Sequence, residues 1–482
     1  MDISEILKLS PEQQITSLKA AKTVTTPDKD ALAKQWNPRQ HDVFDTTLRP
    51  DKRVRKATGE TGADGRPVMA EGYEPVNRIA VPFQRIIVNR AVGFLLGNPV
   101  IVKSYIYDDN PQQVTLVKMV EYTLDDNKSR YFDRKLARTV KSECEAAELW
   151  YPVEDPSFWR RRLDNAAGVQ FKLRVQLLSP SNGDTLYPAF DDTGDLVAFS
   201  RGYQTVDGPD KIDHFDTWTQ DRVVTRTKTK TGWEVDDRPS TLGKIPVIYY
   251  HQDEPDWATV QPVIDRFEKK LSNFGDTNDY FGSPMVKVKG QVRSLPDKTS
   301  QGKVLQLESD ADASYMSWDQ SPESEKLEFE ILEKIIYAMT QTPNISFADM
   351  QAMGGEMSGF AIKLLFTDAH LKAENDIEIF GEMYQRRLNL LRHVLGKRIN
   401  TALESEADNV WLEPVFTPYL PKNNKEEIEI LATARGNKPL ISRKTAAENN
   451  PLVGDVDAEL NRMQEDADAE AAQVAKELTG TY

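Results

Sequence analysis

The chain has 482 residues, of which 39% are hydrophobic and 28% are charged, and its formal net charge is −15. These values predict a folded protein of about two to four domains and argue against wholesale disorder. The acidic excess disfavours a protein whose whole surface grips nucleic acid, but it allows a polyanion to pass along the protein. The single cysteine, Cys144, excludes an internal disulfide and a cysteine-based zinc site.

The N-terminal part, residues 1 to about 75, mixes short helical patterns with a basic stretch, LRPDKRVRKATGETGADGRP, at 48–67. The glycines and the proline of this stretch predict an exposed loop. The alternative is that its basic part, 49–56, contacts DNA backbone or a partner such as the capsid. The acidic start of the chain lacks the apolar run of a secretory signal.

An apolar segment follows at 77–102, and a helical region is predicted from there to about residue 150. Polar residues, glycines and a proline interrupt RIIVNRAVGFLLGNPVIV at 85–102, so this segment cannot supply a membrane-spanning helix. We therefore expect a soluble intracellular protein without a membrane partner. Cys144 lies in VKSECEAAELW, 140–150, whose pattern predicts an amphipathic helix with a buried, unreactive thiol.

Residues 168–252 change to a β-rich pattern. Alternation predicts a strand in VQFKLRVQLLSP, and a hairpin is predicted where two apolar runs flank the Asp-Thr-Gly-Asp of 192–195. A second hairpin is predicted in RVVTRTKTKTGWEV at 222–235, and GKIPVIYYHQ closes the region.

Two helices with a small β module between them are predicted next. The first covers 258–280, and short strands are expected within 285–318. The second covers 321–342, where Pro322 and nearby acidic residues favour a helix start. Apolar residues at helical spacing form a stripe along each helix: Val260, Ile264, Phe267, Leu271 and Phe274 on the first, and Leu327, Ile331, Ile335 and Met339 on the second, flanked by Leu332 and Ile336.

A glycine- and methionine-rich loop is predicted at 343–358, followed by a very long helix at 359–395. The apolar face of that helix carries Ile377, Phe380, Tyr384, Leu388, Leu391 and Leu395. The rest of the chain, 396–482, has helical stretches and an acidic, alanine-rich end. From Glu448 onward, nine acidic residues oppose Arg462 and Lys476, which predicts a solvated helix.

Motifs for catalysis are missing from the sequence. It contains no P-loop, no G-x-S-x-G elbow and no H-E-x-x-H pair. The aspartate pairs 191–192 and 236–237 are expected in turns, and the five scattered histidines are expected at surface or core positions. We therefore predict no catalytic, metal or cofactor site, and the protein is not expected to be an enzyme.

One local charge reversal stands out in this acidic chain. Between Met285 and Lys303, five basic residues oppose Asp297, and they either form a solvated strand face or contact phosphates. These basic residues are Lys287, Lys289, Arg293, Lys298 and Lys303.

The order of these segments resembles the portal proteins of tailed bacteriophages, in particular the SPP1-like group. The resemblance covers residues 75 to 395: VNRIAVPFQRIIVNRAVGFLLGNPVIV, then LGKIPVIYY, VIDRFEKKLSNFGDTNDYFGSP, and GGEMSGFAIKLLFTDAHLKAENDIEIFGEMYQRRLNLL. Its most specific part is the Ser-Gly-x-Ala start of the long helix with the glycine-rich run before it.

The resemblance implies an α+β portal fold and a homo-oligomeric ring of twelve subunits around a channel for double-stranded DNA. The parts implied are a mixed α/β wing with a long spine helix, a two-helix stem, a small α/β clip, a tunnel loop and a helical crown. Their boundaries are 1–257 for the wing, 258–280 and 321–342 for the stem helices, 281–320 for the clip, 343–358 for the tunnel loop, 359–395 for the spine and 396–482 for the crown with its acidic tail.

The same resemblance implies partners and a location. The ring would stand at one capsid vertex of the virion after assembly in the host cytoplasm. It would pass DNA during packaging and ejection, and bind the terminase large subunit, head-completion or adaptor proteins, and major capsid and scaffolding proteins. It implies no cofactor.

The tunnel loop would face DNA, and Ser358 would cap the helix behind it. The residues expected to face DNA are Asn344, Asp349, Met350, Met353, Gly354, Gly355, Glu356 and Met357. The alternatives are an enzyme that uses the glycine-rich loop as a ligand lid, and an assembly protein without a DNA channel.

Overall fold

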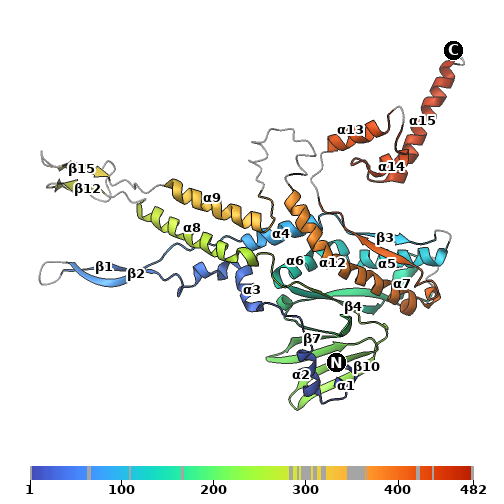
Figure 1. Ribbon diagram of the computed structural model, residues 1–482, viewed down its shortest axis with the longest axis horizontal. Coiled ribbons are helices and arrows are strands. Elements are labelled where there is room, and N and C mark those ends of the chain that lie inside the picture. Colours follow the sequence, from blue (N-terminus) through green and yellow to red (C-terminus); the bar gives the residue numbers. More distant parts are fainter. Residues whose placement is uncertain are drawn as a thin grey trace. The chain divides into compact units, whose positions relative to one another are not determined.

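The computed structural model divides the chain into two compact units, which comprise residues 1–342 with 372–418, and residues 343–371 with 419–482. The structure describes residues 3–61, 67–107, 110–163, 168–281, 286–289, 292–294, 306–307, 312–315, 322–344, 364, 366–419, 424–436 and 439–478. Within these ranges it combines helices with antiparallel strands (Figure 1), which confirms the predicted mixed α and β composition.

The first unit begins with short helices and a two-stranded ribbon. The helical elements are α1 (Ile3–Ile6), α2 (Pro11–Ala20), α3 (Lys29–Trp36), η1 (Pro38–Gln40) and η2 (Asp42–Phe44). The stretch predicted as an exposed loop instead forms β1 (Lys52–Thr61) and β2 (Pro67–Glu74), which pair antiparallel. The loop prediction was wrong because Gly59 lies near the end of β1 and Pro67 is the first residue of β2, positions at which they leave most of both strands free to pair.

A helical layer follows the ribbon. Its helices are α4 (Phe83–Leu95), α5 (Pro111–Asp126), α6 (Ser129–Glu143) and α7 (Pro156–Arg160). Strand β3 (Ile101–Tyr105) follows α4 in the chain, and strand β4 (Glu145–Glu154) follows α6. The predicted helix over 140–150 is confirmed only for 140–143, because α6 ends at Glu143 and its C-cap Cys144 has a left-handed φ of 64°. The chain then continues as β4, where buried residues occupy both faces and remove the alternation that marks a strand.

Two antiparallel sheets form the β-rich part of the first unit. One has the order β11-β4-β5 and the other β10-β9-β8-β7-β6. The new strands are β5 (Phe171–Leu178), β6 (Thr185–Phe190), β7 (Leu196–Asp207), β8 (Asp210–Trp218), β9 (Arg222–Thr229), β10 (Gly232–Pro239) and β11 (Val247–His251), with η3 (Pro180–Asn182) before β6. Both predicted hairpins are confirmed, as the pairs β6–β7 and β9–β10.

The buried side chains arrange these sheets in layers. Phe199, Trp218 and Tyr249 pack between the two sheets. Phe215 faces the other side of the five-stranded sheet, where it packs against Ile15 of α2 and its neighbours. Positions of opposite parity along β8 thus supply two separate cores, as the alternation of a strand requires.

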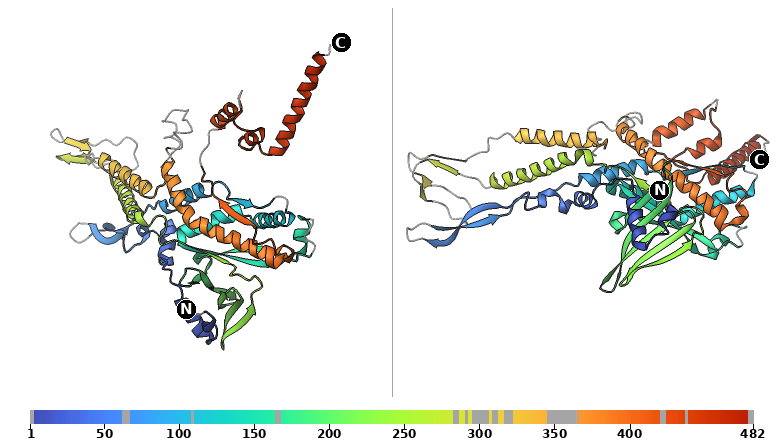
Figure 2. Two further views of the ribbon diagram at one scale, coloured as in Figure 1. Left: turned by 45° about the vertical axis from the view of Figure 1, so that its right-hand side comes forward. Right: turned by 60° about the horizontal axis from the view of Figure 1, so that its bottom comes forward.

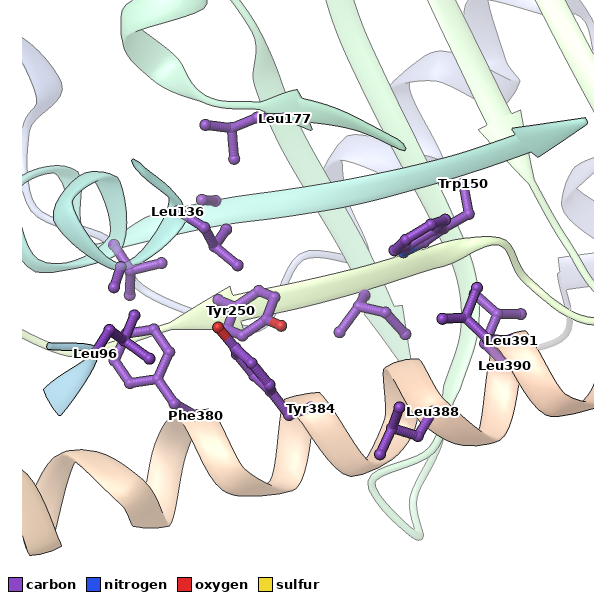
Figure 3. Close-up of a cluster of buried hydrophobic side chains, with 14 of the residues drawn as sticks. Leu96, Leu136, Trp150, Leu177, Tyr250, Phe380, Tyr384, Leu388, Leu390 and Leu391 are labelled. Atoms are coloured by element: carbon purple, nitrogen blue, oxygen red, sulfur yellow. The ribbon is translucent and has the colours of Figure 1, made fainter. Parts of the chain in front are cut away.

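The other side of the three-stranded sheet packs against the helical layer and a long helix, α12 (Thr367–Val394). Figure 3 shows Phe380 and Tyr384 of α12 pointing toward the strand that carries Tyr250, and the Phe380 and Tyr250 ring centroids lie 5.9 Å apart. The predicted long helix is confirmed from residue 367, whereas 359–363 lie outside the described residues. This layer is the largest core of the first unit.

After α12 the chain stays in the first unit. It continues through a π-helical turn (Leu395–Ile399), η6 (Thr401–Leu403) and β16 (Trp411–Val415), and β16 pairs with β3. The predicted crown begins at 396, but the structure divides the chain after Pro418. Among the helices of the second unit, α13 (Asn424–Ala434), α14 (Arg443–Glu448) and α15 (Val456–Leu478) border an open groove of about 460 Å³.

The remaining part of the first unit, which precedes α12 in sequence, is a pair of helices. Small strand pairs lie between the two helices in sequence. They are η4 (Ala258–Val260) with α8 (Gln261–Phe281), and α9 (Pro322–Met339), and they lie side by side in Figures 1 and 2. Between them the chain forms β12 (Val286–Lys289) paired with β15 (Asp312–Tyr315), and β13 (Val292–Ser294) paired with β14 (Gln306–Leu307). No helix within the described ranges has the length and apolar character of a membrane-spanning segment.

Candidate assembly surface on the α8–α9 pair

The two helices of the α8–α9 pair hold each other through aromatic and charged contacts. Phe329 of α9 makes edge-on contacts with Phe267 and Phe274 of α8, with ring centroids 5.4 and 6.0 Å apart. Glu328 lies 2.8 Å from Arg266 and 3.0 Å from Lys270. The apolar contacts supply most of the stabilisation, because ion pairs that remain partly exposed contribute at most about 1 kcal/mol each.

The opposite side of α8 is bound by the segments on either side of the β1–β2 ribbon. Arg49, just before the ribbon, pairs with Asp276 at 2.6 Å. Just after the ribbon, the backbone nitrogen of Asn77 donates to Asp276 at 2.7 Å, and that of Ile79 donates to Ser272 at 2.9 Å. Both ends of the ribbon are therefore fixed to the same face of α8.

Helix geometry shows that these two contact surfaces are separate. Each residue turns an α-helix by about 100°, so Phe267 and Phe274 share one side. Ser272 and Asp276 then lie on roughly the opposite side. Figure 1 shows the same arrangement, with α8 between α9 and the β1–β2 ribbon.

A buried histidine joins α8 to the chain before the ribbon. His41 Nδ1 lies 2.7 Å from Glu268 Oε1, and its Nε2 lies 2.8 Å from the carbonyl oxygen of Gln35. Burial lowers the pKa of His41, but the hydrogen bond and negative charge of Glu268 outweigh burial, so the pKa is raised above 6.5. The same carboxylate accepts a hydrogen bond from the backbone nitrogen of Val81 at 2.8 Å.

We expect this pair to make stability depend on pH. A raised folded-state pKa means that the folded chain binds a proton that the unfolded chain has released above about pH 6.5. The stabilisation is therefore fully present below that pH and is lost as pH rises through the folded-state pKa. Thermal melts from pH 5.5 to about 8.5 should show this loss in the wild type and not in His41→Gln; equal pH profiles would contradict the assignment.

The outward face of α9 carries an unusual apolar stripe. Leu327, Ile331, Ile335 and Met339 are spaced four residues apart and are 56%, 47%, 39% and 64% exposed, respectively. The predicted stripe is therefore present but is not covered within the chain, where α9 instead buries Ile336 and Tyr337. Scattered exposed apolar residues are normal, whereas a continuous row of four makes this face of α9 a candidate interaction surface.

The C-terminal end of α9 is held by a buried charge cluster. Lys372 of α12 donates to the carbonyl oxygen of Thr340 at 3.2 Å and lies 2.9 Å from Asp256. Lys141 of α6 lies 3.1 Å from Asp256 and 2.7 Å from Asp376. Burial raises the pKa of Asp256, but the two lysines outweigh burial and hold it below its ordinary value. The cluster joins the end of α9 to α6 and α12.

Most residues that the sequence assigned to DNA contact lie outside the described residues. This applies to Asp349, Met350, Met353, Gly354, Gly355, Glu356, Met357 and the cap Ser358, and to Lys298 and Lys303. Asn344 is described and exposed. Lys287 and Lys289 lie in β12, opposite Ser314 and Asp312 of β15, and Arg293 lies in β13. The predicted strand for the two lysines is therefore present.

Several residues relevant to chemistry are placed in structural roles. Burial and nearby carboxylates raise the pKa of the Cys144 thiol to about 12, so it stays protonated at neutral pH. Asp191 accepts hydrogen bonds in the β6–β7 turn, as predicted. Asp236 and Asp237 lie in strand β10 instead of the predicted turn. In the described part of the chain, no group of three acidic, histidine or cysteine side chains is arranged to hold a metal ion.

The contacts of α8 with the ribbon ends were missed by sequence reasoning. Arg49 and Asp276 are 227 positions apart, as are His41 and Glu268. No local pattern links such distant residues. The one available signal was the basic character of 49–56, for which a partner contact was an alternative.

This chain is similar to known proteins in sequence and in structure. The model of the family described as "Phage portal protein, SPP1 Gp6-like" matches residues 40–473. The portal protein of Bacillus phage SPP1 is 22% identical over 413 residues, which cover 81% of this chain and 76% of that protein. A chain in a solved neck structure of an empty GTA particle, computed with C6 symmetry, is 12% identical with a TM-score of 0.40, covering 75% of this chain and 87% of that chain. Because the family model spans most of its length, this chain belongs to the SPP1 Gp6-like family of phage portal proteins.

Proposed function

We propose that copies of this chain form a ring at one capsid vertex, around a channel through which double-stranded DNA is packaged and ejected. The observation that carries this proposal is the exposed apolar stripe of α9, within a chain of the portal family. A monomer would leave four large apolar side chains in water along one helix, whereas a ring buries them in every subunit. Twelve subunits is the number that we propose.

The parts of the chain take these roles in the proposed ring. The α8–α9 pair is the stem, the strands between its helices form the clip, residues 343–358 are the tunnel loop, and α12 is the spine behind it. The two sheets with their helical layer form the wing. We place the crown after Pro418, because the preceding strand β16 pairs with β3 of the first unit.

The acidic balance of the chain suits a channel that DNA must slide through. Each phosphate neutralised by a lysine or arginine adds affinity, so a channel lined with basic residues would hold the duplex. A net charge of −15 per subunit keeps such contacts few. In this role the protein is not an enzyme and needs no cofactor. Its proposed partners are the terminase large subunit, then head-completion or adaptor proteins, with capsid and scaffolding proteins around the ring.

Electron microscopy of the purified full-length protein in negative stain tests the proposal. We expect rings with an axial hole as wide as a DNA duplex. Monomers at micromolar concentration would overturn it. Closed discs without a hole would favour an assembly protein, and nucleotide hydrolysis by the pure protein would favour an enzyme.

The basic strand β12 supplies a prediction on DNA passage. Exchanging Lys287 and Lys289 together for Glu should leave ring assembly intact and reduce the DNA packaged per particle by at least about tenfold, because phosphates would meet two anions at each subunit. Lys228→Glu with Lys230→Glu makes the same change of charge on the β9–β10 hairpin and serves as the control. Normal packaging by the first variant, measured as nuclease-protected DNA, would remove β12 from the DNA path.

The tunnel loop supplies a second prediction, which rests on its sequence. Methionine side chains adapt to irregular surfaces and glycines allow large backbone excursions, so the loop suits contact with moving DNA. Deleting residues 349–357 should spare ring formation and impair packaging or retention of DNA. Full packaging by the deleted protein would show that the loop is dispensable.

A further inference from the structure

The helix α8 separates two exposed surfaces that lie on opposite sides of the α8–α9 pair. The first is the α9 stripe of Leu327, Ile331, Ile335 and Met339. The second is on the β1–β2 ribbon, where Met69 is 52% and Tyr73 is 64% exposed. In Figures 1 and 2 the ribbon extends beside α8 on the side away from α9.

We propose that the β1–β2 ribbon of one copy packs on the α9 stripe of the next copy. The inference rests on the proposed ring and specifies which surfaces meet in it. The occupant of the stripe is thus a second copy of this chain, and the contact joins two different surfaces. Such a head-to-tail contact repeats from each copy to the next. It closes into a ring when each copy is related to its neighbour by the same rotation and these rotations add up to a full turn. A stripe that paired with itself would stop at a dimer.

The register of the ribbon places suitable side chains on one face. Residues directly opposite in an antiparallel pair share a face, and alternate residues along a strand do so as well. Arg53 is opposite Tyr73, Arg55 is opposite Glu71, and Ala57 is opposite Met69. One face therefore carries the two exposed apolar side chains together with two arginines.

Charged residues accompany both apolar surfaces. Glu323 and Glu330 lie exposed beside the stripe on α9, and Glu330 is 3.9 Å from Lys326. The ribbon face carries Glu71 as well as Arg53 and Arg55, and in the proposed contact the two arginines would meet the two glutamates of α9. The stripe is about 18 Å long from Leu327 to Met339, at 1.5 Å per residue. The four steps from Met69 to Tyr73 span about 13 Å.

The ribbon also needs a partner on physical grounds. A two-stranded sheet alone in water is marginally stable, and three strands or packing against a helix is needed for independent stability. The bonds to α8 hold the base of the ribbon through Arg49 and Asn77, which lie outside the two strands. A helix of the next copy, laid on the face with Met69 and Tyr73, supplies the missing packing.

Cysteine cross-linking tests this contact and can be read separately from ring formation. Cys144 is buried, so the native thiol can stay in place. Ile331→Cys and Tyr73→Cys are made singly and together in the full-length protein, oxidised mildly, and analysed on denaturing gels without reductant. We expect the double variant to give a ladder of covalent oligomers, and a mixture of the two single variants, combined before assembly, to give covalent dimers.

The cross-linking and microscopy results together separate failure of the ribbon contact from failure of the proposed ring. Rings by electron microscopy without a ladder would overturn the ribbon contact and leave the proposed function standing. Covalent dimers of Ile331→Cys alone would show a stripe-to-stripe contact and also overturn it. A protein that forms no rings contradicts the proposed function itself. As a second readout, Arg53→Glu with Arg55→Glu should lower the cross-linked yield of the double variant at least about fivefold, and adding Glu323→Arg with Glu330→Arg should restore it.

Discussion

Replacing Arg387 with Met is expected to lower the free energy of unfolding of the first unit by about 3–5 kcal/mol, the range found when one partner of a buried ion pair is removed. Arg387 is 2% exposed in the core between α12 and β4. Its guanidinium lies 2.8 Å from Asp133 and donates through Nε to Glu148 at 2.9 Å. Without the arginine, the fully buried Glu148 keeps neutral donors such as the Tyr250 hydroxyl but loses its counter-charge.

The pH dependence of this loss follows from the carboxylates. Burial raises the pKa of Asp133 to about 6 although Arg387 opposes that shift. In the variant, protonation of Asp133 at low pH removes a buried charge that nothing compensates, so the destabilisation should be larger at pH 8 than at pH 5. Urea unfolding followed by tryptophan fluorescence at both pH values measures it.

The neighbouring residue offers a matched control. Arg386 is exposed on the same helix and pairs with Glu382 at 2.7 Å, four residues earlier. Arg386→Met removes the same side-chain charge, and its effect should be at most about 0.5 kcal/mol, as for other exposed pairs on helices. If both variants were equally stable, the network around Arg387 would not contribute to the fold.

Ile331→Asp is expected to convert the proposed ring into monomers without unfolding the chain. Fully burying an isoleucine side chain contributes about 1.5–3 kcal/mol, and an unpaired carboxylate in its place adds a desolvation cost of several kcal/mol. Because each 1.4 kcal/mol corresponds to a tenfold change in affinity, the affinity between neighbouring subunits should fall by at least about a hundredfold. Light scattering after gel filtration gives the mass, and circular dichroism checks the helices.

Lys326→Asp is the control for this second variant. Lys326 is exposed on the same helix, beside the stripe, and its substitution by Asp introduces the same carboxylate while leaving the four stripe side chains in place. It should leave the ring mass unchanged at physiological salt. If Ile331→Asp still formed rings of the wild-type mass, the α9 stripe would lie outside the contact between subunits. Other apolar residues would then have to stabilise the ring.

Local sequence patterns predicted the long helices well. The spacing of apolar residues gave α8, α9 and most of α12, and turn residues gave the β6–β7 and β9–β10 hairpins. These features depend on residues only a few positions apart, for which helix and strand periods differ clearly. The segment 145–150 failed because a strand buried on both faces has no such period.

The direction of an apolar stripe could not be read from its spacing. Leu327 and Ile331 share one side of the predicted helix and Ile336 lies on roughly the opposite side, and it is the side of Ile336 that the structure buries. Periodicity fixes which residues share a face, whereas the neighbours of that face come from distant segments. For α9, those neighbours are α8 and the core around Phe83.

By itself, the sequence determined the helices and strands that depend on local periodicity, the acidic balance, and the kinship with phage portal proteins. Only the tertiary structure decided that the basic stretch after Arg49 is a ribbon whose ends are fixed to α8, and that the α9 stripe faces outward. It also brought Arg387 to Glu148 across 239 positions. The physical reason is that burial and ion pairing depend on which distant segments meet, and that outcome reflects the packing of the whole chain rather than the pattern of any one segment.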